Sequence, residues 1–137
     1  MVNRFSVPNL YDCTKHLANV ASRKIQPELI LKNAYILSTY TNRILENKEI
    51  WISKGRIACI EENGQAEKSF NYKNLVLFDA QYNILAPGLI DPHMHIESSM
   101  MTGCAYAEAA LLNGTTTIFC DSHEIGNVCD TEAIEWM

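Results

Sequence analysis

The stretch PGLIDPHMHIESS, from Pro87 to Ser99, decides how this chain is expected to fold. It continues a nearly unbroken apolar run, Ile84 to Asp91, which is typical of a strand buried on both faces in a parallel α/β sheet. Alternate side chains of a strand point to one face. Asp91, His93 and His95 therefore project together, with neighbours about 6.6–7 Å apart. Two imidazoles at this spacing can bind one divalent cation.

The residues after this stretch have the pattern of a strand–helix–strand unit. Thr102 is placed to cap a helix, and Gly114 lies where a helix commonly ends. The β-branched run Thr115 to Asp121 then predicts a second strand, and the helix between them suits a right-handed parallel crossover. Active sites of parallel α/β barrels lie at the carboxyl ends of the strands, so the histidine pair is expected there. A further helix is expected to begin at Asp130.

Polar residues also follow the second strand. Alternation places Asp121 and His123 on one face, toward the same mouth, and Glu124 comes next in the chain. These side chains are candidates for contacts to a substrate or for support of metal ligands. Equally, Asp121 and His123 can hydrogen-bond a loop while Glu124 is solvated. Asp91 has two comparable interpretations, because its carboxylate can orient an imidazole or stabilise the turn.

The chain before this stretch predicts a helix and then a small β unit. Apolar residues from Leu10 to Ala21 recur at the 3.6-residue period of a helix, and Pro27 prevents its continuation. The following residues are rich in β-branched and aromatic side chains, and Lys54-Gly55 predicts a tight hairpin turn. Antiparallel strands are expected over residues 29–37, 49–53, 56–60 and 74–80.

These patterns divide the chain into three segments of an α/β protein. They are an N-terminal helix segment (1–27), part of a small β-sandwich-like domain (28–83) and the start of a barrel (84–137). A complete (β/α)8 barrel needs at least about 200 residues, whereas this chain has 137. The barrel is therefore expected to be incomplete.

Composition and charge disfavour several classes of protein. Eleven Lys and Arg against sixteen Asp and Glu give a net charge of −5, without a basic patch for nucleic acid or an anionic membrane. No apolar stretch approaches the about 20 residues of a membrane-spanning helix, and no signal peptide is expected. Five cysteines without a CxxC spacing indicate reduced thiols. The expectation from these features is a soluble, cytoplasmic protein, and they are compatible with a homo-oligomer.

The segment His95 to Glu97 also matches the H-x-E motif of the cytidine deaminases. That motif needs a downstream P-C-x-x-C to complete its zinc site, whereas Cys120 and Cys129 are nine residues apart. This assignment is therefore disfavoured. An isolated HxH can also be a pair of ordinary polar residues near a turn. The apolar strand before it, with Asp91 and Glu97 on either side, favours a metal site.

Two stretches resemble the bacterial adenine deaminases of the amidohydrolase superfamily: LAPGLIDPHMHIESSMMT (85–102) and NGTTTIFCDSHEIGNV (113–128). The PGLIDxHxH pattern is specific to the superfamily, and HIESSMMT narrows it to this branch. The resemblance implies an N-terminal helix, part of a small β domain and the first βαβ of a TIM (β/α)8 barrel. Gly103 and Ser122 stand where the family usually has proline, and neither is a ligand candidate.

The resemblance implies hydrolysis of adenine to hypoxanthine and ammonia by a metal-activated water, with manganese or iron as the divalent metal. His93 and His95 carry over as metal ligands. The acid/base residues of the family come from later barrel strands, which are absent here, so none is assigned. Five residues are candidates to contact the substrate or support the ligands: Asp91, Glu97, Asp121, His123 and Glu124.

The missing strands leave alternatives open. Two histidines leave a divalent ion short of protein ligands, and unpaired strand edges favour aggregation. The chain alone is therefore expected to be an inactive, poorly soluble fragment. The alternatives are a non-catalytic truncated remnant, or an amidohydrolase that acts on another aminopurine or a cyclic amide.

Overall fold

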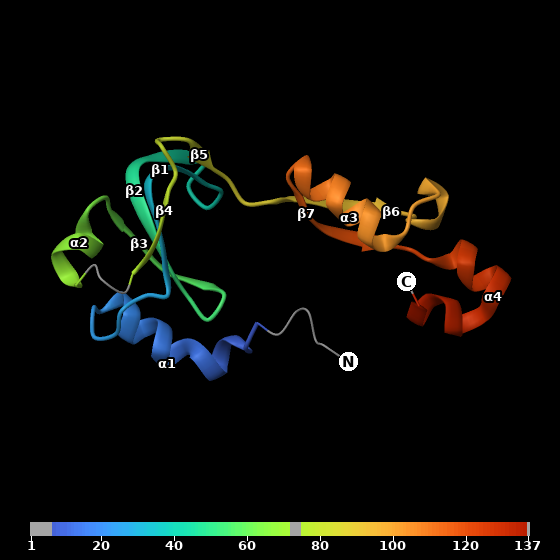
Figure 1. The fold of residues 1–137 in the computed structure, drawn as a ribbon, viewed down its shortest axis with the longest axis horizontal. Coiled ribbons are helices and arrows are strands. Elements are labelled where there is room, and N and C mark those ends of the chain that lie inside the picture. Colours follow the sequence, from blue (N-terminus) through green and yellow to red (C-terminus); the bar gives the residue numbers. More distant parts are fainter. Residues whose placement is uncertain (1–6, 72–74, 137) are drawn as a thin grey trace. The chain divides into compact units, whose positions relative to one another are not determined.

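A computed structural model describes residues 7–71 and 75–136 of the chain. They form two compact units, which divide between Ala86 and Pro87. In Figure 1 the first unit runs from blue to yellow and the second from yellow to red. No helix in the described part of the chain is both long and apolar enough to cross a membrane.

The described residues of the first unit form a five-stranded mixed sheet. Its order is β3-β2-β1-β4, and β5 also pairs with β1. Three strands form antiparallel pairs, β1 with β2 and β2 with β3. The Lys54-Gly55 turn closes the second hairpin as predicted, with φ of 55° and 67°. The strands are β1 (Leu29–Ser38), β2 (Arg43–Ser53), β3 (Arg56–Glu62), β4 (Val76–Asp79) and β5 (Ile84–Leu85).

Strands β4 and β5 run parallel to β1, so the expectation of a wholly antiparallel unit is wrong. An antiparallel neighbour can follow a short hairpin, whereas a parallel neighbour needs a longer crossover. The connection from β3 to β4 contains helix α2 (Gln65–Ser69), which gives the chain the length to return in the direction of β1. Asn74, the first residue of the strand predicted over 74–80, lies outside the described residues.

Helix α1 (Leu10–Ala21) packs one apolar stripe against β2 and β3. Cys13, Leu17 and Val20 on this stripe are buried, as the spacing of three and four residues predicts. Asn9 occupies the N-cap position without a capping hydrogen bond from its side chain. His16 ties the helix to the sheet, because its Nε2 atom lies 2.8 Å from the hydroxyl of Ser53.

The sheet of the first unit is covered by apolar residues on both faces. The neighbours Ile50 and Trp51 point to opposite faces and belong to separate buried clusters. One cluster joins Trp51 to Val20 of α1, Ile30 of β1 and Ala66 of α2. The other consists of Ala34, Ile36, Ile50 and Ala80.

The second unit has a two-stranded parallel sheet, β6 beside β7, joined through a helix. Thr102 caps that helix as predicted, since its hydroxyl accepts a hydrogen bond from the Ala105 amide at 3.3 Å. Gly114 follows the helix with φ of 85°. The elements are β6 (Leu89–Met94), η2 (Glu97–Ser99), α3 (Gly103–Leu112), β7 (Thr115–Cys120) and α4 (His123–Trp136).

The strand expected over residues 84–91 is divided between the two units. Its first part is β5, which pairs with β1, and β6 begins only at Leu89. Pro87 has no amide hydrogen to donate to a ladder, and Gly88 lies tightly against β7. A β-carbon at Gly88 would lie 2.1 Å from the hydroxyl of Thr116. The two compact units divide between β5 and β6, after Ala86.

A helical segment that the sequence does not predict precedes the last predicted helix. Helix α4 starts at His123, and Asp130, the predicted start, is a kink within it with φ of 61° and ψ of −167°. The Asp130 carboxylate accepts the Thr131 amide at 2.7 Å, so this residue starts only the second part of the helix. His123 consequently belongs to a first helical turn and not to a continuation of β7. Met137, the last residue of the predicted helix, lies outside the described residues.

Candidate metal centre

The structure brings the two histidines of the HxH motif into contact. His93 lies in β6 and His95 directly follows that strand. Their Nε2 atoms are 3.1 Å apart, and the rings meet edge to face with centroids 4.8 Å apart. The alternation of side chains along a strand explains why both rings reach the same side.

This separation fits two ligands of one metal ion. Nitrogen ligands about 2.0–2.1 Å from a divalent ion lie about 2.9–3.4 Å apart in octahedral and tetrahedral geometries. The 3.1 Å between the two Nε2 atoms falls within this range. Imidazole nitrogens are also common ligands of zinc, copper, iron and nickel. The pair therefore suits a divalent metal in both spacing and chemistry.

Asp121 joins the HxH motif to the second strand end. The Asp121 amide donates to the Met94 carbonyl at 3.0 Å, which continues the β6–β7 pairing by one step. This places the Asp121 carbonyl 2.6 Å from Nδ1 of His95. Because a carbonyl only accepts, Nδ1 of His95 carries the hydrogen and Nε2 carries the lone pair that a metal requires.

The Asp121 carboxylate holds a third imidazole. Its Oδ2 atom lies 2.9 Å from Nδ1 of His123, and the His123 ring meets the His95 ring edge to face with centroids 4.8 Å apart. The hydrogen bond and charge of Asp121 raise the pKa of His123. The hydrogen bond from His123, followed by the charges of His123 and His95, lowers the pKa of Asp121. The pair therefore favours its charged forms.

Asp91 acts on the backbone before the histidines. Its Oδ1 atom accepts the His93 amide at 3.1 Å, next to an irregularity in the pairing of β6 with β7 between Asp91 and Met94. Of the two interpretations considered for this carboxylate, the structure shows the local contact. Asp91 therefore shapes the strand end that presents the two rings.

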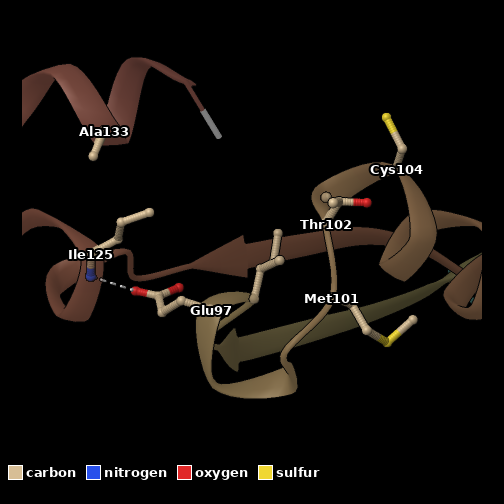
Figure 2. A pocket seen from close by; sticks show the side chains of 8 residues that line it. Glu97, Met101, Thr102, Cys104, Ile125 and Ala133 are labelled. Carbon is tan, nitrogen blue, oxygen red and sulfur yellow. Dashed lines mark hydrogen bonds between the residues drawn. The ribbon is translucent and has the colours of Figure 1, made fainter. Parts of the chain in front are cut away.

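The acidic residues Glu97 and Glu124 join the η2 turn to the first turn of α4. The Ser98 hydroxyl lies 2.8 Å from each oxygen of the Glu124 carboxylate. Oε1 of Glu97 accepts the Ile125 amide at 3.5 Å, and Figure 2 shows these two groups facing each other. The pairing of Ser98 with Glu124 cannot be predicted from the sequence, since it depends on how the two segments fold toward each other.

A mostly apolar pocket of about 470 Å³ lies beside Glu97. Oε2 of Glu97 is buried and has no hydrogen-bond partner among the described residues. The sequence patterns do not indicate this pocket, because its lining comes from three separate segments. These are represented by Ile96 near η2, Met101 and Cys104 at the start of α3, and Ile125 and Ala133 of α4.

No family model matches this chain. An adenine deaminase from Chelativorans sp. (strain BNC1) is 56% identical over 136 residues, which are 99% of this chain and 22% of that protein. An adenine deaminase from Clostridium botulinum (strain ATCC 19397 / Type A) is 33% identical over 137 residues, 100% of this chain and 22% of that protein. A solved structure of molinate hydrolase matches with a TM-score of 0.51 and 18% identity, over 69% of this chain and 24% of that one.

The chain combines a small mixed β unit with a parallel strand–helix–strand unit that carries paired histidines at a strand end. The molinate hydrolase structure shares this fold over 69% of the chain. In sequence, the chain is similar to the matching part of adenine deaminases over 99–100% of its own length. It spans about a fifth of the length of the relatives it matches, with 22% of each covered.

Proposed function

We propose that this chain forms one part of an adenine deaminase, which converts adenine and water to hypoxanthine and ammonia. The observation that carries this proposal is the 56% identity to the Chelativorans adenine deaminase over 136 residues. Because the match takes in 99% of the chain, the histidine cluster lies within the matched range. Five free cysteines support a reducing, cytoplasmic location as part of this proposal.

His93 and His95 are proposed to hold a divalent metal ion, either manganese or iron. When bound, such an ion supplies an activated water for attack on C6 of the purine. Asp121 fixes the ring of His95 through its carbonyl, and Asp91 fixes the backbone of His93. These contacts hold the two rings in a binding geometry before any ion arrives, which reduces the ordering cost of binding.

The apolar pocket beside Glu97 is proposed to lie at the edge of the substrate site. Its lining of aliphatic and sulfur-containing side chains suits the flat face of a purine, and Glu97 offers a carboxylate oxygen without another partner among the described residues. Glu124 is proposed to support this region through Ser98. A neutral base with ring nitrogens and an amino group can hydrogen-bond such a carboxylate.

Hydrolysis also requires a proton to move from the attacking water to the departing amine. We propose that the group responsible comes from the part of the enzyme outside this chain. The 137 residues alone are accordingly proposed to be inactive. A non-catalytic remnant would be inactive in every context, whereas a functional part would regain activity once the remainder is supplied.

A chimera tests this function. This chain replaces the matching 136-residue segment of the Chelativorans adenine deaminase, and purified protein with Mn²⁺ is assayed for conversion of adenine to hypoxanthine. We expect the chimera to have deaminase activity within about tenfold of the parent enzyme. In the variant His93→Ala/His95→Ala we expect the activity to fall at least about 10³-fold and the bound manganese to be lost. The variant His16→Ala, which removes the histidine of α1, is the matched control and should retain manganese.

Three results would decide against this function. A well-folded chimera without activity indicates a non-catalytic remnant. Preference for another aminopurine or a cyclic amide in a parallel substrate panel indicates a different member of the superfamily. Unchanged manganese content after loss of both histidines excludes them as the ligands.

A further inference from the structure

We propose that His123 is a third imidazole ligand of the metal centre formed by His93 and His95, and that Asp121 positions it. This inference rests on the proposed metal centre. Its basis is a juxtaposition that the HxH motif does not include: His95, Asp121 and His123 each offer a donor atom within 4.8 Å of the others. His95 directly follows β6, Asp121 directly follows β7, and His123 begins α4.

Asp121 orients the rings of His95 and His123, and in both rings it contacts the Nδ1 atom. The carbonyl of Asp121 faces Nδ1 of His95 at 2.6 Å, and its carboxylate faces Nδ1 of His123 at 2.9 Å. Both oxygens accept, so both Nδ1 atoms carry hydrogen and each Nε2 atom of a neutral ring holds a lone pair. A carboxylate or carbonyl on the second ring nitrogen is the usual support of a histidine that binds metal.

The state of His93 follows from this arrangement. Since Nε2 of His95 holds a lone pair, the 3.1 Å contact between the two rings requires His93 to donate through its Nε2 hydrogen. In the tautomer that carries its hydrogen on Nδ1, His93 would offer the Nε2 lone pair to a metal ion held by His95. The existing contact thus keeps the two nitrogens at ligand spacing.

The helical turn that carries His123 is also held in place through its neighbours in the chain. The Ser98 hydroxyl bonds the carboxylate of Glu124, the next residue in the chain, and the Glu97 carboxylate accepts the Ile125 amide. Both contacts act on the first turn of α4, which carries His123. A third ligand on a turn fixed in this way loses little conformational freedom when the ion binds.

Titration with Co²⁺ tests the inference on the intact chain, fused to a soluble carrier protein with the carrier alone as blank. Visible absorption reports both affinity and ligand number, independently of catalysis. We expect His123→Ala to weaken Co²⁺ binding at least about tenfold and Asp121→Asn to weaken it about 10–100-fold. The control His16→Ala should leave the affinity unchanged, because this histidine lies in the first unit.

The possible failures are distinguishable. If His93→Ala and His95→Ala weaken binding while His123→Ala does not, His123 is no ligand and the proposed metal centre remains. If none of the three variants changes the affinity, both proposals fail. A measurement on the unmodified chain removes any effect of misfolded variants. With ¹⁵N-labelled histidine and saturating Zn²⁺, the Nε2 resonance of His123 should move to the range of metal-bound nitrogen, and an unmoved resonance overturns the inference.

Discussion

At the scale of single residues, Asp121 shows what periodicity can and cannot predict. Alternation along a strand predicts the contact of His93 with His95, because it concerns neighbours on one segment. It also suggests that Asp121 and His123 lie on one face, and they do meet, although His123 begins a helix. The contact between the Asp121 carbonyl and His95 depends on the register of β6 against β7, which no single-strand pattern specifies.

Asp79 makes the stability of the first unit sensitive to acid. Its Oδ1 atom accepts from the Asn33 side chain at 2.9 Å and from the Gln81 amide at 2.8 Å, and these bonds lower its pKa below the ordinary 3.8. A carboxyl with a lowered pKa in the folded state contributes stability above the ordinary pKa, and this contribution is lost as the pH falls through the lowered value.

We therefore expect Asp79→Asn to lower the urea midpoint at pH 6 and to have a smaller effect near pH 3. Urea unfolding followed by circular dichroism at both pH values measures the difference. The exposed carboxylate of Glu46 on β2 provides the control, Glu46→Gln. An equal effect of Asp79→Asn on the urea midpoint at both pH values would contradict a stabilising role of the ionised Asp79 carboxylate.

At the scale of elements, one buried carboxylate joins β2 to helix α2. Glu49 is 1% exposed. Its Oε1 atom accepts from the indole of Trp51 at 2.8 Å and the Ala66 amide at 2.6 Å, and Oε2 accepts from the Gly64 amide at 2.9 Å. A negative charge at the start of a helix is favourable, and the three donors compensate for its burial. The crossover that makes β4 parallel begins from this anchored turn.

Removal of the Glu49 carboxylate should lower the free energy of unfolding substantially. Glu49→Ala leaves three donors without a partner in the interior, so we expect a loss of unfolding free energy on the order of 3 kcal/mol. Glu49→Gln keeps one acceptor and should cost less. Chemical denaturation measures both variants against Glu46→Ala, an exposed position on the same strand that should change stability by less than about 0.5 kcal/mol. A cost for Glu49→Ala as small as that of the control would refute the anchoring role.

At the scale of the whole molecule, the two units differ in how much apolar surface they bury. The first has two buried clusters on its sheet. In the described part of the second unit, Ile96, at 9% exposure, is the only buried large aliphatic residue. Leu89, Ile90 and Phe119 on its two strands remain more than half exposed, as does Leu112 on α3. Apolar surface of this extent favours association with further polypeptide or with other copies.

Separation of the units should reveal this difference. We expect residues 1–86, expressed alone, to stay monomeric and unfold cooperatively, and residues 87–137 to aggregate and bind a hydrophobic dye. Sedimentation velocity and dye fluorescence measure the two outcomes. A monomeric second unit that does not bind the dye would contradict the expectation.

The sequence by itself determined the elements and the first half of the site. Helical and strand periods specify α1, the Lys54-Gly55 hairpin, the Thr102 cap and the convergence of His93 with His95, because each depends on residues a few positions apart. Tertiary structure alone decided the parallel pairing of β4, the split of residues 84–91 between two sheets and the place of His123 beside His95. These depend on contacts between distant segments, whose register and crossover path local patterns do not encode.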